Sequence, residues 1–338
     1  DPKEVYLYYA IAYEYMGKYD SSATVLLKGL SFLPDNVDLR KRLAFAYDKQ
    51  GKTDLRMDEL DRLSFLAPED VDIKSELAKL YGDQEKYDDQ IAVLKDLLKL
   101  QPNNEGAQSD LAAAYEASGR DPLDVYKTRY DNNTDNISYG LDYADRLSAA
   151  DRPNDAAKIL KQVVNTDPTS KVAFRKLASA YDLADRLTEA AKTYERLFRL
   201  DPHDFRVAVK ISDVYVEDQD YSSAFDWADK AVTLSGEGEA YGAKGNVYYK
   251  AFQACRSGEI SINDRVIATL AYNAFEDAES KGYSRYSRSK EWLKENEVLF
   301  GKAQWFMMDA EVKNKGYIKA ETACYQWVSE RLNKGKGW

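Results

Sequence analysis

The sequence predicts an all-α protein built from repeated pairs of short helices that stack into a solenoid. Three observations predict this fold. Prolines recur every 34 residues, helix-capping residues recur at the same spacing, and a leucine–alanine–tyrosine pattern marks the first helix of each pair. Each series reflects a different physical requirement of a helix, so their common register indicates real repeats. With 338 residues, 44% of them hydrophobic, the chain can bury a large core.

The segment 37–70 shows one complete unit of the pattern. Leu43 and Tyr47 lie at helical spacing, Gly51 can end that helix in the left-handed conformation, and Pro68 stops the second helix. The same proline position returns along the chain at Pro34, Pro102, Pro168 and Pro202.

Polar residues that can cap helices follow the same period. The residues placed to begin first helices are Asn36, Asp70, Asn104, Asn136, Ser170 and Asp204. The residues placed to begin second helices are Asp20, Asp54, Asp88, Asn154, Thr188 and Ser222. We expect each to accept hydrogen bonds from the first N–H groups of its helix.

Packing positions share this register. The first helices carry Ala10 and Tyr13, then Leu43, Ala44 and Tyr47, Leu77, Ala78 and Tyr81, Leu111, Ala112 and Tyr115, Leu177, Ala178 and Tyr181, and Ile211, Ser212 and Tyr215. The small middle residue allows close approach of two helices, and the tyrosine supplies a large apolar area with a polar tip. One helix pair cannot bury both of its apolar faces, so the units are expected to stack.

Together, these features resemble the tetratricopeptide repeat family, which also shows glycines such as Gly17, Gly51 and Gly119 at the turn and tyrosines such as Tyr19 shortly after it. The resemblance implies a right-handed superhelical solenoid of antiparallel helix pairs whose first helices line a concave groove. It covers residues 1–236 as seven units with approximate bounds 3–36, 37–70, 71–104, 105–136, 137–170, 171–204 and 205–238. Residues 237–338 are expected to form a divergent eighth pair and an irregular helical cap.

The fourth unit is two residues short, because Pro102 and Pro168 are 66 rather than 68 residues apart. Its second helix is expected to open at Asp121–Pro122 and to run into a polar loop at residues 131–136. Two interpretations stay open: a neutral deletion absorbed by a shortened helix, or a bend or loop that contacts a partner.

The region after residue 236 leaves the repeat register. Residues 239–254 and 263–281 each predict a long helix, with a loop at 256–261 between them, and residues 333–338 predict a frayed tail. Aromatic and basic residues alternate in the stretch that contains Tyr283, Arg285, Tyr286, Arg288 and Trp292. We interpret these aromatics as the core of helices that cover the open end of the solenoid, rather than as a nucleic-acid surface.

Charge and cysteine content exclude several classes. The formal net charge of −10 disfavours nucleic acid and anionic membrane surfaces as partners. No apolar run is long enough to span a membrane. The two cysteines, Cys255 and Cys324, predict neither a disulfide framework nor a metal site. The chain starts at Asp1, so we expect a soluble protein with a processed or truncated N-terminus, in the cytoplasm or a bacterial cell envelope.

The sequence does not predict an enzyme, a cofactor or a metal. His203 is the only histidine and follows Pro202 in a turn. The chain also lacks a glycine-rich phosphate loop, a nucleophile elbow and the common zinc motifs. Paired-carboxylate chemistry stays open on counting alone, but most carboxylates fall at caps or on polar helix faces.

Partner binding in the groove is the leading hypothesis. In the family, positions two, five, nine, twelve and thirteen of a unit face the groove. The resulting candidates are Lys41, Phe45, Asp48, Lys79, Glu116, Asp145, Arg175 and Asp182. In the seventh unit the same positions hold Arg206, Val209, Asp213 and Glu217, so the lining is mixed and leans acidic. This acidic lining suits a protein or peptide segment with basic or apolar groups.

Some relatives grip a chaperone's C-terminal tail with lysine at position five and asparagine at position nine. Lys41 matches that pattern, but Phe45 replaces the asparagine, and Ser75 and Lys79 do not restore it. We therefore do not expect a chaperone tail as the partner.

The chain is accordingly predicted to be a non-catalytic interaction scaffold. The alternative is a structural assembly subunit that docks another protein through an aromatic patch in its C-terminal region. That patch would comprise Trp292, Trp305, Phe306 and Met308.

Overall fold

The computed structural model describes residues 2–336 and 338. The chain divides into two compact units, Asp1–Arg146 and Leu147–Trp338. Both are helical, and helices that follow one another in sequence pack together within them. This is the expected all-α architecture of consecutive helix pairs. The bounds of the repeats and the division at residue 236 stay predictions.

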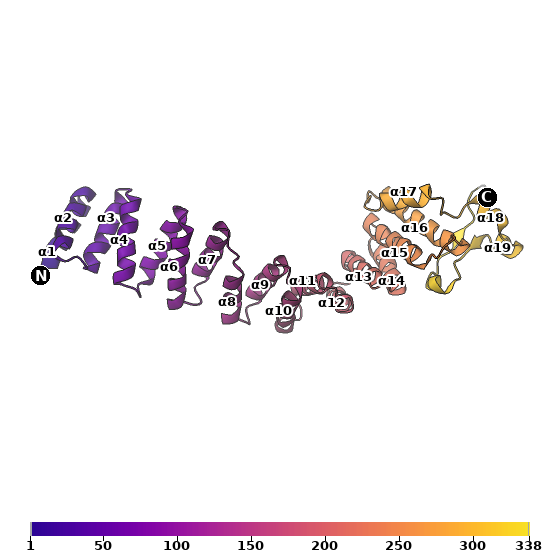
Figure 1. Cartoon of the computed structure of the whole chain (residues 1–338), viewed down its shortest axis with the longest axis horizontal. Coiled ribbons are helices and arrows are strands. Elements are labelled where there is room, and N and C mark those ends of the chain that lie inside the picture. The colour runs from indigo at the N-terminus through magenta and orange to yellow at the C-terminus, as the bar shows by residue number, and fades with distance from the viewer. Residues whose placement is uncertain (1, 337) are drawn as a thin grey trace. The chain divides into compact units, whose positions relative to one another are not determined.

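The first unit contains alternating first and second helices, with odd and even labels respectively (Figure 1). They are α1 Pro2–Tyr15, α2 Tyr19–Phe32, α3 Val37–Lys49, α4 Thr53–Leu66, α5 Val71–Asp83, α6 Tyr87–Leu100, α7 Glu105–Ala117 and α8 Leu123–Asn132. Helix α9, Ile137–Ala149, contains the boundary between the units. Helix α6 has 14 residues and α8 has 10, so the deficit of the fourth repeat falls in its second helix.

The second unit continues the alternation and then becomes irregular. Its helices are α10 Pro153–Thr166, α11 Lys171–Leu183, α12 Leu187–Leu200, α13 Phe205–Glu217, α14 Tyr221–Ser235, α15 Gly238–Cys255, α16 Ile262–Ser280, α17 Ser287–Glu295, α18 Lys302–Met307 and α19 Ala310–Lys315. A small antiparallel pair, β1 Tyr317–Ile318 and β2 Leu332–Asn333, encloses a 3₁₀ turn at Ala323–Tyr325. The two long helices predicted after residue 236 are α15 and α16.

The predicted caps of the first helices are confirmed. The Asn36 side chain accepts from the Leu39 N–H at 3.1 Å, and Asp70 accepts from the Ile73 N–H at the same distance. Equivalent bonds are made by Asn104, Asn136, Ser170 and Asp204. Each bond satisfies one N–H group that the helix itself leaves without a partner.

The predicted caps of the second helices are wrong by two positions. Helix α4 begins at Thr53, so Asp54 lies inside its first turn, and the residue at the cap is Lys52, which makes no side-chain capping bond. Asn154 and Thr188 also lie inside their helices, and α14 is capped by Asp220 rather than Ser222. The same holds for the carboxylates Asp20 and Asp88, which follow the caps Lys18 and Lys86 by two residues. The reason is that the turn needs only one residue between the left-handed position and the helix. These carboxylates still lie at the positive end of the helix dipole.

One left-handed residue follows the first helix of each of the first seven pairs. These residues are Gly17, Gly51, Glu85, Gly119, Asp151, Asp185 and Gln219. The spacing is 34 residues except across the short fourth unit, where it is 32. Four of the seven carry side chains in a conformation that favours glycine, so the turn geometry is imposed by the packing of the helices on either side.

The core is a series of clusters shared by neighbouring pairs. Leu43 lies in a cluster with Ala10 and Leu26, whereas the adjacent Ala44 lies in the next cluster with Leu60 and Leu77. Helix α3 is therefore buried on two sides, as the stacking argument requires. Further packing residues predicted from the sequence and found buried are Tyr47, Ala78, Tyr81, Leu177, Ala178 and Tyr181.

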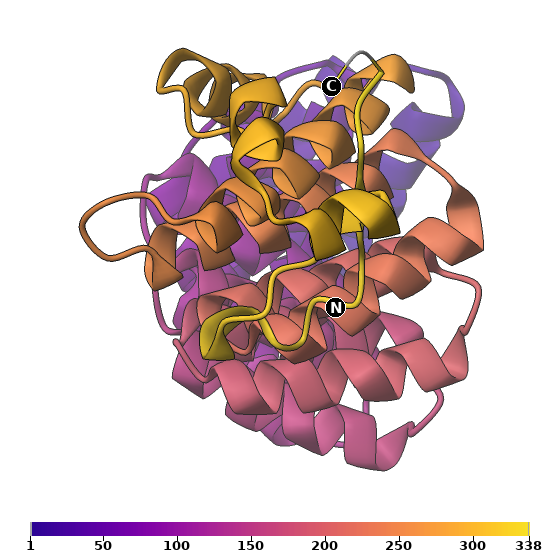
Figure 2. The ribbon, with the colours of Figure 1, turned by 90° about the vertical axis from the view of Figure 1, so that its right-hand side faces the viewer.

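The C-terminal segment lies across the last long helices, where the yellow chain crosses the orange helices in Figure 2. Cys255 at the end of α15 and Cys324 form a disulfide, with their Cα atoms 6.1 Å apart. The sequence did not predict this bond, because the two cysteines are 69 residues apart and only the fold brings them together. The Tyr325 hydroxyl also donates to Asp264 at 2.7 Å in the core.

The prediction of a frayed tail is wrong for its described residues. Asn333 pairs with Tyr317 in the small sheet. The Trp338 ring centre lies 5.7 Å from that of Phe300 and 6.0 Å from that of Trp305. Gly337 lies outside the described residues. No helix in the described part of the chain combines the length and apolar character needed to cross a membrane.

The backbone conformation of two exposed glycines predicts that replacing each with alanine has opposite effects on the free energy of unfolding. Gly51 has φ +67°, and no atom lies within 4 Å of the position that a Cβ would take. The change Gly51→Ala therefore causes backbone strain but no steric clash, and it should lower the free energy of unfolding by about 1 kcal/mol. Gly106, in the first turn of α7, has no positive φ, and Gly106→Ala should raise stability by a few tenths to about 1 kcal/mol. Urea unfolding followed by circular dichroism measures both. Equal effects of the two changes would contradict the strain argument.

The disulfide predicts a redox-dependent stability of the second unit. Closing a loop of 69 residues stabilises the folded state by about 4 kcal/mol in the chain-entropy account. The double change Cys255→Ser and Cys324→Ser should therefore lower the thermal midpoint of unfolding. Reductant should produce a similar drop in the wild type and no further drop in the variant. A wild-type midpoint that is insensitive to reductant would show that the bond contributes little.

Candidate functional site

Hollows lie between successive first helices in the first unit. Hollow A, of about 250 Å³, lies between α1 and α3 and includes Ile11, Tyr15 and Arg42. Hollow B, of about 360 Å³, lies between α3 and α5. Hollow C, of about 310 Å³, lies between α5 and α7. Each can accept a side chain of a bound segment.

Phe45 lines both hollow A and hollow B. Its side chain is 39% exposed, meets the Tyr19 ring edge-on at 6.3 Å, and carries the Lys49 ammonium 5.2 Å from its ring centre. Large aromatic residues that stay partly exposed between two hollows are well suited to anchor a partner. Phe45 was chosen from the sequence because no packing requirement calls for an aromatic residue there.

The predicted charged residues near Phe45 already have partners. Lys41 pairs with Asp70 at 2.6 Å, and Asp48 pairs with Arg56 at 2.6 Å. The Lys41 ammonium and the N–H group of Ile73 hold the pKa of Asp70 below its usual value. Because Asp70 is also the cap of α5, Lys41 serves the junction between two repeats. Hollow B therefore brings Lys41, Phe45 and Asp48 together but leaves only Phe45 without such a role.

Two of the other predicted charged residues, Arg175 and Glu116, also form ion pairs within the chain. Arg175 pairs with the cap residue Asp204 at 3.0 Å, which repeats the arrangement of Lys41 and Asp70. Glu116 pairs with Arg146 at 2.5 Å. Lys79 is exposed and lines hollow C. Asp145 is exposed on α9 and has an interaction of its own.

In the second unit, a polar hollow of about 370 Å³ lies between α11, α13 and α15, and we call it the carboxylate hollow. Its acidic residues are Asp182 on α11 and Asp213 and Glu217 on α13. Its other polar and charged residues are Lys210, Asn246, Lys250, Arg285 and Tyr286. The last two come from the segment between α16 and α17, so the C-terminal region forms one wall.

None of the three carboxylates has an ion pair within the described part of the chain, whereas Asp48 in hollow B pairs with Arg56. Burial raises the pKa of Asp213 to about 6, although Lys210 and Arg285 oppose the shift, and Glu217 and Asp182 add to it. Burial also raises the pKa of Asp182 and of Glu217. The cations near Asp213 therefore offset only part of the cost of burying its negative charge. The arrangement favours a ligand that brings a positive charge or several hydrogen-bond donors.

The lining of the carboxylate hollow is mixed in charge. Among the described residues, no group of three or more histidine, cysteine or acidic side chains is placed to hold a metal ion. The mixture of carboxylates, cations and one amide instead matches the donors and acceptors of a peptide segment with a basic side chain.

The sequence predicted three of the ten residues that line this hollow. Asp182, Asp213 and Glu217 were predicted to face the groove. The contributions of Arg285 and Tyr286 were missed, because they come from beyond the repeats. The interpretation of the aromatics in that stretch as core is confirmed for Tyr286 and Trp292, which pack against the core of the second unit, but it did not indicate that Arg285 and Tyr286 also line a hollow.

The residues of the alternative docking patch do not form one exposed surface. Trp305 is 4% exposed, and Trp292 and Met308 are partly buried against the core of the second unit. Phe306 is 80% exposed, and its exposed neighbour is Met307. Trp305 is therefore a core residue, because the Trp338 and Phe300 rings pack near it.

The shifted pKa predicts the pH dependence of one variant. Folding raises the pKa of Asp213 from 3.8 to about 6, so the folded chain binds a proton that the unfolded chain lacks between these values. The wild type should lose stability as pH rises through this window. Asp213→Asn should be more stable than wild type at about pH 7.5, and the difference should shrink at about pH 4.5. Thermal melts of wild type and variant at the two pH values measure the difference.

The control is Asp218→Asn, because Asp218 is exposed at the end of the same helix. An equal gain in stability with Asp218→Asn would contradict the assignment of the effect to the buried Asp213.

Models of the tetratricopeptide repeat match residues 71–104 and 147–212. No curated protein sequence matches it. Among solved structures, the crystal structure of MamA is 21% identical, with a TM-score of 0.41, and the match covers 53% of this chain and 97% of that one. The crystal structure of YrrB, a TPR protein with an unusual peptide-binding site, is 16% identical, with a TM-score of 0.41, and the match covers 55% and 97% of the two chains. The two repeat models agree with the helix pairs and the 34-residue spacing of caps and turns, so the chain contains tetratricopeptide repeats in these two stretches.

Proposed function

We propose that this chain is a non-catalytic scaffold that holds a segment of a partner protein against its first helices. The observation that carries the proposal is Phe45, a partly exposed aromatic residue between two hollows that no described residue fills. An apolar side chain of the partner on either side of Phe45 would bury its ring. Burial of a large aromatic ring is the commonest source of a binding hot spot.

The carboxylate hollow supports the same function in the second unit. Asp182, Asp213 and Glu217 are acidic and have no ion pair with any described residue, so a lysine or arginine of the partner gains more at this hollow than at hollow B. In hollow B the partner would compete with the Arg56 pairs. The Asn246 amide can both donate to and accept from a peptide backbone. The proposed partner segment is therefore basic or apolar, and a chaperone tail that ends in acidic residues does not fit.

The proposal predicts that Phe45→Ala weakens partner binding at least about tenfold, because the residue is the anchor of two hollows. Phe65 is the matched control. It is 76% exposed on the second helix α4 and lines none of hollows A, B or C. Capture from the native source with wild type, Phe45→Ala and Phe65→Ala, quantified by mass spectrometry, measures the loss.

Phe306→Ala tests the alternative in the same experiment. If the partner is lost with Phe306→Ala and retained at full strength with Phe45→Ala, the chain binds through its C-terminal region and the groove proposal fails. Circular dichroism of each variant separates a lost contact from a lost fold.

A further inference from the structure

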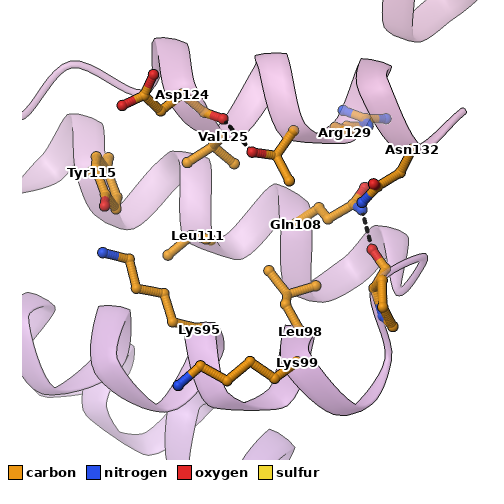
Figure 3. Close-up of a pocket in the computed structure, with 12 residues that line it drawn as sticks. Lys95, Leu98, Lys99, Gln108, Leu111, Tyr115, Asp124, Val125, Arg129 and Asn132 are labelled. Carbon is orange, nitrogen blue, oxygen red and sulfur yellow. Dashed lines mark hydrogen bonds between the residues drawn. The ribbon is translucent and has the colours of Figure 1, made fainter. Parts of the chain in front are cut away.

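A second kind of hollow in the first unit lies beside the shortened helix of the fourth repeat. We call it the α6–α8 hollow, and its volume is about 380 Å³ (Figure 3). Helices α6 and α8 form its walls, and Leu111 and Tyr115 of α7 line its floor. Hollow C uses other residues of α7, namely Asp110, Ala113 and Ala117. The α6–α8 hollow therefore lies on a different side of α7 from the proposed partner groove.

The interior of this hollow is apolar. Leu98, Pro102, Leu111 and Val125 line it. Its volume falls within the range of sites that bind small molecules, which typically combine apolar walls with a few fixed polar groups. The body of a ligand here should be a ring or a short hydrocarbon.

Two buried polar atoms at one end make no hydrogen bond, although the Arg129 guanidinium itself lies 3.8 Å from the centre of the Tyr139 ring and 3.6 Å from the Asp142 carboxylate. The Gln108 side chain is 4% exposed, and its Nε2 donates to the Pro102 carbonyl at 2.5 Å, which identifies Oε1 as an acceptor. That Oε1 and the Nε–H of Arg129 are both buried without a hydrogen bond. Figure 3 shows the Gln108 amide and Arg129 at the same end of the hollow, beside Asn132. One ligand hydroxyl could donate to Gln108 and accept from Arg129, and so satisfy both atoms.

A positive charge lies toward the other end. The Lys95 ammonium is 5.3 Å from the centre of the Tyr115 ring and has no ion pair with any described residue. Lys99 lines the same wall but pairs with Asp96 at 2.7 Å, so it is already partly neutralised. Asp124 at the rim disfavours a second negative group. One carboxylate is therefore the anion that this end can take.

We propose that the α6–α8 hollow binds a small amphipathic carboxylate whose apolar body carries a hydroxyl at its far end. The carboxylate meets Lys95, the body lies on Leu98, Leu111 and Val125, and the hydroxyl joins Gln108 and Arg129. A phenolic acid has this chemistry, and so does the terminal tyrosine of a peptide with a free carboxylate.

Titration of the full chain with three probes tests the chemistry. The probes are para-hydroxyphenylpropanoate, phenylpropanoate, which lacks the hydroxyl, and tyramine, which has an ammonium in place of the carboxylate. Isothermal calorimetry should show the hydroxy acid binding about tenfold or more tightly than phenylpropanoate, and tyramine should bind more weakly than either acid. Equal affinity of the two acids, or tyramine binding as tightly as the hydroxy acid, overturns the proposal.

Two variants localise the effect. Gln108→Met keeps the shape but removes the acceptor, so the advantage of the hydroxyl should disappear while phenylpropanoate still binds. Lys95→Gln, at an exposed position that should not affect folding, should weaken both acids, and it should strengthen tyramine because it removes the repulsion between two ammonium groups. Lys28→Gln, on the exposed side of α2, is the matched control. If Lys95→Gln and Lys28→Gln bind the acids equally well, the site is not this hollow.

A final pair of probes distinguishes the source of the ligand. A short peptide that ends in tyrosine is compared with its C-terminal amide and with the free phenolic acid. Tighter binding of the peptide acid than of the phenolic acid, with loss in the amide, assigns the hollow to a protein C-terminus. The reverse order assigns it to a free small molecule.

Discussion

A pair of short antiparallel helices has more apolar surface than it can cover by itself, and every other feature of this chain depends on that constraint. The adjacent residues Leu43 and Ala44 enter different core clusters, so α3 is held between its own partner helix and the helices of the next pair. Each pair is thus stabilised by its neighbours. Hollows B and C form where the successive first helices α3, α5 and α7 do not fill the space between them. The candidate binding surface is a consequence of how the pairs stack.

Local signals were predictable from the sequence. The caps Asn36 and Asp70 are recognisable because an N-cap needs a short side chain with an acceptor, and few residue types have one. Gly51 is recognisable because glycine adopts the left-handed conformation without strain. Glu85 occupies the same position in the next repeat and could not be identified, since nothing in its residue type indicates that conformation.

Features that depend on distant residues were not predictable. The Cys255–Cys324 bond and the wall that Arg285 adds to the carboxylate hollow both require knowledge of how the C-terminal segment returns to the long helices. The repeat register predicted that Lys41 faces the groove, and it lines hollow B. The register could not show that the ammonium reaches the cap of the next repeat, because that contact depends on the side chain's direction.

The charges of the two units illustrate why position in a repeat does not determine role. Lys41 and Arg175 occupy equivalent positions, and each stabilises a cap whose carboxylate is needed by the following helix. Asp213 has no such partner, and its raised pKa means that the folded chain holds this charge at a cost. A carboxylate that destabilises its own fold is better explained by a ligand than by packing. The unpaired carboxylates are therefore stronger candidates for binding than the more numerous paired ones.

The fourth repeat shows how a solenoid can gain a pocket without losing its register. After the deficit, the first-helix caps resume at Asn136 and Ser170, and the left-handed turn resumes at Asp151. The missing residues are confined to α8, because its neighbours are fixed by their own caps and by their own clusters. A solenoid cannot close the resulting gap by moving whole pairs without breaking those contacts. The space that remains is the α6–α8 hollow, and the buried Gln108 acceptor in it is unpaired because the described chain supplies no side chain to meet it.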